Sequence, residues 1–261
     1  MKILGFFVVS LFLVGCGMSK VVSSDQNDDK DAIWQYGVVS KFVLNPNVNS
    51  DSTTVNIHYT LAKSDAVVKK ITDSLISTYL DLTCCLQPNE LIGSSTLEKY
   101  SESFLQDYLN VVNNESPSAF PWNLSLDLDF CYINKNYIKA EFSTETYMGG
   151  AHGNVNFTSY MIDSRTNKIV RLEDICSNVS ELEKRAEQIF RSNYGISKNA
   201  DLDLEGFWFQ DNKFKLNQNF FFNEKSITFI FNQYEIAPYV MGIFEIEIPF
   251  SNNKDIIHIE R

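Results

Sequence analysis

A histidine and three glycines lie together in the stretch YMGGAHGN, residues 147–154, which follows an alternating, strand-like run. A histidine in such a loop could act as a general base or bind a metal ion. The chain has two other histidines, His58 and His258, and neither forms an HExxH pattern with His152. No GxSxG elbow provides a serine nucleophile. The sequence therefore does not predict a hydrolytic zinc or serine site.

The glycines of this loop have a simpler, conformational explanation. Gly149, Gly150 and Gly153 permit positive φ and close backbone approach where one strand crosses to the next. His152 can then fix the loop by a hydrogen bond to a nearby carbonyl or carboxylate. We interpret His152 as structural and the protein as a non-enzyme. The alternative is an envelope hydrolase that uses His152 with nearby acidic residues.

A second candidate segment is NQYEIAPY, residues 232–239, in which Glu235 lies just before a prolyl turn. A single carboxylate there is typical of a turn or cap partner rather than a general acid. With Gly149, Gly150 and His152, the residues Tyr234, Glu235 and Tyr239 form the candidate loop or binding set. The sequence does not establish whether Glu235 pairs with another acid, for which the candidates are Asp163, Glu173 and Asp174.

Residues 206–222, GFWFQDNKFKLNQNFFF, are unusually rich in aromatic side chains. The favoured interpretation is two sheet strands with buried phenylalanines. The alternative is an exposed aromatic surface, formed by Phe207, Trp208 and Phe209, for a protein or glycan partner.

Four cysteines follow Cys16 in the chain: Cys84, Cys85, Cys131 and Cys176. An even number in an exported protein permits two disulfides. A bond between neighbours is strained, so bridges from the adjacent pair would run to the other two cysteines. Four buried thiols are an equally weighted alternative. No CxxC pair occurs and no histidine lies at ligand spacing, so we predict no metal and no cofactor.

The first sixteen residues, MKILGFFVVSLFLVGC, have the layout of a secretory signal peptide. The ending LVGC resembles the lipobox of bacterial lipoproteins, in which the cysteine carries acyl chains, such as palmitate, and the preceding peptide is removed. The resemblance implies a signal peptide over residues 1–15 and a membrane anchor at Cys16. Such an anchor would be stable, because several acyl chains hold a protein at a membrane where one chain binds only marginally. The alternative is an ordinary signal peptide with a chance cysteine. Residues 16–33 are polar and acidic, as expected of a tether.

The formal net charge of −11 bounds the possible partners. Nucleic acid binding needs clustered Lys and Arg, so nucleic acid is excluded as a partner. An acidic domain would instead attract a basic macromolecule. The 44% hydrophobic content supports a folded core, and no later apolar run is long enough to span a bilayer.

Hydrophobic periodicity predicts the elements that must position these loops. Alternation predicts strands at 34–44, 53–61, in a hairpin within 122–148, in a second hairpin after the glycines, and in the tail beyond residue 226. Helical spacing predicts about three amphipathic helices, within 63–82, at 96–112 and at 180–195. Strands and helices do not alternate as βαβ units, so we predict an α+β fold with antiparallel sheets in two adjacent α/β subdomains.

Three segments in the right order, YMGGAHGN, KIVRLEDI and FIFNQYEIAPYVMGIFEIEIPFS, resemble the extracytoplasmic domain family found in the anti-sigma factor RsiV and the peptidoglycan deacetylase PdaC. The match covers about residues 145–251, and the region before it resembles the companion N-terminal domain more loosely. The resemblance implies a PdaC-like domain at 34–145, an RsiV-like domain at 146–251 and a tail at 252–261. Only Met1 and Lys2 precede the apolar run and no deacetylase domain follows Arg261, so we expect the sensor half of such proteins.

The resemblance and the charge together predict a lipid-anchored module of the cell envelope, exported to a membrane that the sequence does not specify. Its expected ligand is a lysozyme-like basic protein or peptidoglycan, since relatives carry this domain pair as a lysozyme receptor or beside a wall-modifying domain. The alternatives are the envelope hydrolase and a structural envelope lipoprotein.

Overall fold

The computed structural model describes residues 34–48, 52–63, 65–83 and 94–260. Cys16, the signal peptide, the tether and the cysteines Cys84 and Cys85 lie outside the described residues. Within the described part of the chain, no helix is long and apolar enough to cross a membrane.

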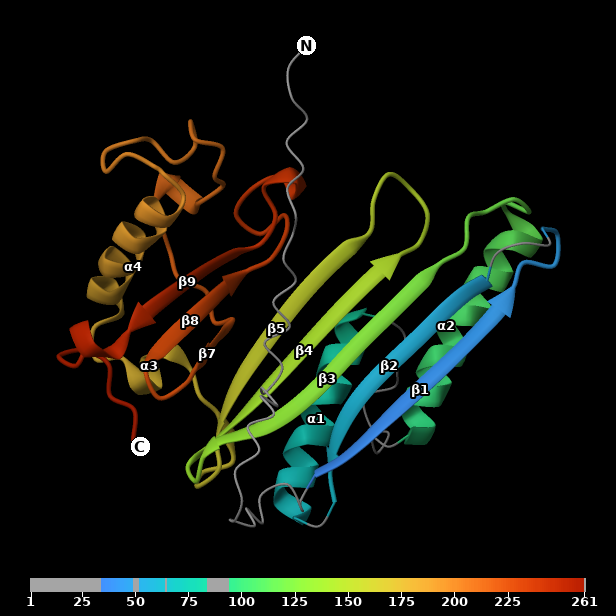
Figure 1. Cartoon of the computed structure of the whole chain (residues 1–261), viewed down its shortest axis with the longest axis horizontal. Coiled ribbons are helices and arrows are strands. Elements are labelled where there is room, and N and C mark those ends of the chain that lie inside the picture. The colour runs from blue at the N-terminus through green and yellow to red at the C-terminus, as the bar shows by residue number, and fades with distance from the viewer. Residues whose placement is uncertain (1–33, 49–51, 64, 84–93, 261) are drawn as a thin grey trace, which may run out of the picture.

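A six-stranded sheet in the order β1-β2-β3-β4-β5-β6 forms the larger part of the molecule (Figure 1). Its strands are β1 (Trp34–Leu44), β2 (Ser52–Ala62), β3 (Asn123–Asn134), β4 (Tyr137–Tyr147), β5 (Asn154–Asp163) and β6 (Lys168–Ile169). Every neighbouring pair is antiparallel except β2 and β3, which are parallel. This departs from the expected antiparallel arrangement because α1 (Ala66–Thr83) and α2 (Ser94–Asn114) intervene, and such a crossover brings the chain back in the same direction.

The two crossover helices cover one face of this sheet (Figure 1). Alternate residues of β3, such as Leu124, Leu126 and Leu128, point into the core beneath them, together with Ile57 and Phe142. The opposite face of β3 carries Ser125, Asp127 and Asp129. The alternation in the sequence therefore predicted correctly which face is buried.

A smaller antiparallel sheet follows, with strands β7 (Phe220–Phe222), β8 (Ser226–Phe231) and β9 (Phe244–Pro249). Helices α3 (Leu172–Ile175) and α4 (Val179–Asn193) precede it, and short 3-10 turns lie at Gln210–Asn212, Tyr239–Met241 and Phe250–Asn252. The predicted third helix is α4, but its N-cap is Asn178, whose side chain accepts the Glu181 amide at 3.0 Å, rather than Ser180. The mixed α+β architecture with two adjacent domains is confirmed.

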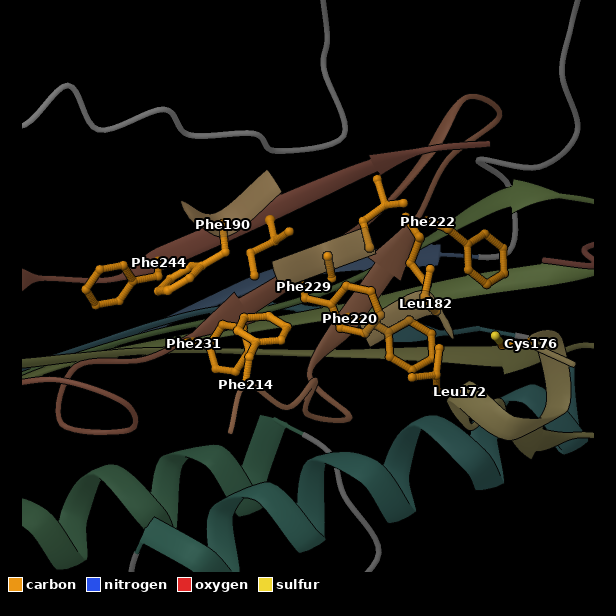
Figure 2. Close-up of a cluster of buried hydrophobic side chains, with 14 of the residues drawn as sticks. Leu172, Cys176, Leu182, Phe190, Phe214, Phe220, Phe222, Phe229, Phe231 and Phe244 are labelled. Atoms are coloured by element: carbon orange, nitrogen blue, oxygen red, sulfur yellow. The ribbon is translucent and has the colours of Figure 1, made fainter. Parts of the chain in front are cut away.

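Phenylalanines fill the second core, between α4 and the small sheet (Figure 2). Phe190 of α4 is fully buried and lies within 5.0–6.0 Å, centroid to centroid, of the rings of Phe207, Phe209, Phe214 and Phe244. Edge-on and tilted ring pairs of this kind contribute beyond the area they bury.

Side-chain amides attach the small sheet to the outer edge of β5. The Asn232 amide accepts the Phe157 N–H at 2.8 Å and donates to its carbonyl at 2.9 Å, and the Asn219 amide accepts the Ser159 N–H at 2.8 Å. We call Asn219, Asn232 and Gln233, which accepts the Val155 N–H at 3.3 Å, the amide clamp. The clamp supplies backbone partners that a further strand would otherwise provide. Strands β5 and β6 thus belong to the first sheet, although the expected boundary lay at 145/146.

The cysteines follow neither of the two schemes considered from the sequence. Cys131 is disulfide-bonded, whereas Cys176 is a free, buried thiol. Cys176 therefore does not take part in a second disulfide.

Candidate binding surface

Two loops meet at one end of the molecule: residues 148–153 between β4 and β5, and residues 232–243 between β8 and β9. The His152 ring stacks on the Tyr239 ring with centroids 3.7 Å apart and an interplanar angle of 17°. Its Nδ1 lies 2.9 Å from the Gly153 carbonyl oxygen, and its Nε2 lies 3.3 Å from the Tyr234 hydroxyl. A carbonyl only accepts, so Nδ1 donates to it, and in that tautomer Nε2 is the acceptor for the Tyr234 hydroxyl.

The glycines serve two different purposes in the first loop. Gly149 and Gly150 have φ of +84° and +105°, which L side chains rarely adopt. Gly153 is required for space, because a Cβ there would lie 2.8 Å from the Thr146 carbonyl oxygen. The Tyr147 hydroxyl donates to the Gly150 carbonyl at 3.2 Å and holds the loop tip. The loop is thus shaped to present the exposed His152 to Tyr239.

Glu235 fixes the second loop. One carboxylate oxygen accepts the Asn232 N–H at 2.8 Å, and the other accepts the Asn217 side-chain amide at 2.7 Å. These bonds close a turn in which Tyr234 has a φ of +64°. The three acids considered as partners form other contacts: Asp163 binds Arg165, Asp174 accepts the Arg171 N–H, and Glu173 contacts Gln218.

The favoured interpretation of buried phenylalanines holds for Phe207 and Phe209, and the alternative aromatic surface requires a correction. Phe207 and Phe209 are buried in the second core, and only Trp208 between them is exposed. The cause is local geometry, since alternate side chains of this extended segment point to opposite sides. Only residues 220–222 of the run form a strand, so the expectation of two strands was wrong.

Trp208 nevertheless belongs to the same end of the molecule as His152. Its backbone N–H donates to the Ile236 carbonyl at 2.8 Å, which joins the loop around residue 206 to the second loop. Gly206 packs toward the Met241 sulfur in the same way. Figure 1 shows these loops near the upper ends of the strands.

We call the exposed side chains of these loops the aromatic end. Its exposed members are Met148, His152, Leu204, Trp208, Tyr234, Val240 and Met241, and the half-buried Tyr239 stacks on His152 among them. Val240 and Leu204 are 89% and 88% exposed, and Trp208 is 52% exposed. Exposed apolar side chains from several loops make this end a candidate binding surface. The aliphatic members were not predicted from the sequence, because exposed and buried residues do not alternate with a regular period in irregular loops.

Acidic side chains border the aromatic end. Leu204 is flanked in sequence by the exposed Asp203 and Glu205, with Asp201 two residues earlier. No ion pair within the described ranges joins Asp203 or Glu205 to a basic side chain. Uncompensated carboxylates beside an apolar patch favour a basic partner.

No metal centre is found in the part of the chain that the structure describes, where no three His, Cys, Asp or Glu side chains group together. His58 lies elsewhere, on β2, with its Nδ1 3.2 Å from an Asp127 oxygen, and His258 contacts Ser177 at 3.3 Å. The three histidines are thus in separate places.

Matches to known protein families fall separately on the two parts of the chain. A family model described as deacetylase PdaC matches residues 47–155, and a model described as a protein of unknown function, DUF3298, matches residues 162–251. The two matches lie in tandem along the chain. This confirms the resemblance seen in the sequence. The PdaC match ends, and the DUF3298 match begins, within β5, the strand that the amide clamp binds.

Crystal structures of two DUF3298 proteins are similar to the whole tandem. One, from Bacteroides fragilis, has a TM-score of 0.69 at 19% identity and covers 87% of this chain and 93% of its own. The other, from Pseudomonas aeruginosa, has a TM-score of 0.59 at 19% identity and covers 87% of this chain and 97% of its own. No curated protein matches the chain. At such identities the likeness shows the shared fold.

Proposed function

We propose that the chain is an extracytoplasmic, lipid-anchored binding module whose aromatic end binds a basic macromolecule of the envelope environment, most directly a lysozyme-like protein. The observation that carries the proposal is the aromatic end itself, where exposed apolar side chains from three loops lie beside unpaired carboxylates. Hot spots of protein interfaces combine such aromatic anchors with a polar rim. The tandem with a PdaC-like domain supports an extracytoplasmic location.

Charge supports a basic partner for this surface. The net charge of −11 would steer a cationic protein toward the chain, and association would slow as salt increases. Peptidoglycan, the second candidate ligand, could stack its sugars on Trp208 and Tyr234 but would show a weaker dependence on salt.

The proposed activity is binding rather than catalysis. Both ring nitrogens of His152 are engaged by the loops, and Glu235 is engaged by two donors of its own turn. These contacts support a structural role for both residues. Hydrolysis of cell-wall fragments that is lost in His152→Ala would instead establish the envelope hydrolase.

Titration of the full chain with lysozyme and with purified wall fragments, at low and high salt, tests the proposal. Val240→Lys should weaken lysozyme binding about tenfold or more, because it places a cation in the centre of the surface without disturbing a buried contact. The matched control is Ile169→Lys on β6, an exposed position at the opposite end of β5. If neither ligand binds at low salt while an envelope protein co-purifies, the structural lipoprotein is correct.

The lipid anchor is tested at Cys16, outside the described residues. Mass spectrometry of the purified N-terminus should show an acylated cysteine. A Cys16→Ala variant that stays bound to membranes would contradict the anchor.

A further inference from the structure

Strand β1 exposes a row of apolar side chains at the edge of the six-stranded sheet. On the face opposite the helices, Val38 and Phe42 are 62% and 69% exposed, and Tyr36 and Leu44 at the two ends of the row are 68% and 60% exposed. Ser40 lies at the centre of the row, where its hydroxyl donates to Asn56 of β2 at 2.7 Å.

The same face is polar on the neighbouring strands. Beside the row, β2 presents Thr54, Asn56 and His58, and β3 presents Ser125 and Asp127 next to them. A second molecule that packed face to face on this sheet would therefore bury polar groups. The apolar side chains lie where a strand could be added beside β1 instead.

The edge carries few of the features that prevent strand addition, and the one present is an inward-pointing lysine. β1 pairs with β2 without a bulge over eleven residues and contains no proline. Its one charged residue, Lys41, points to the helix face, where it binds Glu102 of α2 at 2.5 Å. A long, regular edge whose outward row carries no charge is a template for pairing with another strand.

The outward-facing residues of β1 are ordered so that two antiparallel copies of the strand complement each other. If two copies of β1 pair antiparallel about Ser40, then Ser40 faces Ser40, Val38 faces Phe42, and Tyr36 faces Leu44 of the other copy. Each apolar contact then joins an aromatic to an aliphatic side chain, a favourable class of cross-strand pair. A twofold axis of this kind produces a closed dimer rather than a filament.

We propose that two copies of this chain associate through β1, antiparallel and in register at Ser40, to form one continuous twelve-stranded sheet. The acidic net charge opposes association at long range, but the outward row carries no charge, and exposed charges farther apart than about 8 Å are screened at physiological salt.

Disulfide trapping of the full chain in its native membranes tests the register. Directly opposed Cα atoms of antiparallel strands lie about 4.5–5.5 Å apart, within the range that a disulfide spans. Ser40→Cys should therefore give a species of twice the monomer mass on non-reducing gels after mild oxidation. Ser125→Cys is the matched control, because it lies on the same face but inside the sheet, and it should give none.

Repulsion tests the contact itself. Val38→Lys with Phe42→Lys places like charges opposite each other at both pairs, and should reduce the Ser40→Cys dimer roughly tenfold or more. Val38→Thr with Phe42→Tyr should retain it. Val38 and Phe42 are both exposed, and unchanged thermal unfolding of the variants verifies folding.

Three results would overturn the proposal. One is a Ser40→Cys dimer yield no greater than that of Ser125→Cys. Another is a dimer that persists in the double lysine variant. The third is release of the chain from lipid vesicles by Phe42→Lys at unchanged dimer yield, which would assign the row to a membrane surface.

Discussion

His152 and the glycines around it show how single residues shape the proposed binding surface. Gly153 leaves room for the Thr146 carbonyl, and the strand can therefore turn close to itself. The turn places the imidazole against Tyr239 and within reach of Tyr234. The glycines therefore contribute by positioning His152, and His152 contributes through its contacts with Tyr234 and Tyr239.

Gly153→Ala should destabilise the protein by about 1–3 kcal/mol, because its methyl group would overlap a backbone carbonyl that cannot easily move. Gly195→Ala is the control: its φ of +69° carries strain, but nothing lies within 4 Å of the added atom. Chemical denaturation compares the free energies of unfolding. An equal or smaller loss in Gly153→Ala would contradict the steric role.

Cys176 should resist thiol reagents in the native protein. Burial raises the pKa of its thiol, so little thiolate is present at neutral pH, and access is blocked by the second core. Peptide mapping after iodoacetamide treatment should find it unmodified until denaturant is added. Labelling at the rate of an exposed thiol in native buffer would contradict its burial.

At the scale of elements, β5 is the strand on which both parts of the protein depend. It pairs with β4 along its whole length on one edge and takes side-chain amides on the other. Alternation predicted the strand itself. The amide clamp was not predictable, because its bonds join residues 60–78 positions apart and no local pattern encodes them.

Asn219→Ala should cost about 1–3 kcal/mol, because it removes the acceptor of the Ser159 N–H and a donor to the Phe157 carbonyl. Asn110→Ala, on the exposed surface of α2, should cost less than about 0.5 kcal/mol. Hydrogen exchange should accelerate at Ser159 in the first variant. Unchanged protection there would contradict the clamp.

The turn between β5 and β6 makes stability depend on pH. The Arg165 guanidinium, hydrogen-bonded at 2.6 Å, holds the pKa of the Asp163 carboxyl below its usual value of 3.8. The ionised form is therefore favoured in the folded state, so this contribution is present above pH 3.8 and is lost as the pH falls through the lowered pKa.

Asp163→Asn should accordingly be less stable than the wild type at neutral pH, with a difference that shrinks in acid. Urea unfolding at several pH values measures this, with Asp107→Asn on α2 as a surface control. A difference that stays constant between about pH 6 and pH 3 would contradict the ion-pair origin.

At the scale of the whole molecule, the alternation of side chains predicted most strands and with them the α+β class, whereas the tandem of domains was predicted from the family resemblance. It did not predict the parallel pairing of β2 with β3, since strand order depends on where the crossover helices return. Nor did it separate Trp208 from Phe207 and Phe209, because nothing in three consecutive aromatic residues indicates which side of the extended segment faces the core.

Side-chain contacts connect the two hydrophobic cores, in addition to the polypeptide that runs from one to the other. Tyr137 of β4 and Met161 of β5 belong to the first sheet but are buried in the second core. The Tyr137 ring meets Phe222 edge-on at 5.0 Å, and the buried Lys139 lies 5.0 Å from the centre of the Phe221 ring. Neither part could unfold without exposing apolar surface of the other.

The full chain should therefore unfold in one cooperative transition, although it carries two domains by sequence. Tyr137→Ala removes the ring that bridges the cores and should separate the transition into two, at a cost of about 3–5 kcal/mol for a buried aromatic. Ile169→Ala, which shortens an exposed side chain on β6 of the same sheet, should leave a single transition. Scanning calorimetry distinguishes these outcomes, because the calorimetric and van't Hoff enthalpies agree only for a single cooperative unit. Two resolved transitions in the wild type would show that the cores unfold independently and that the contacts across β4 and β5 do not couple them.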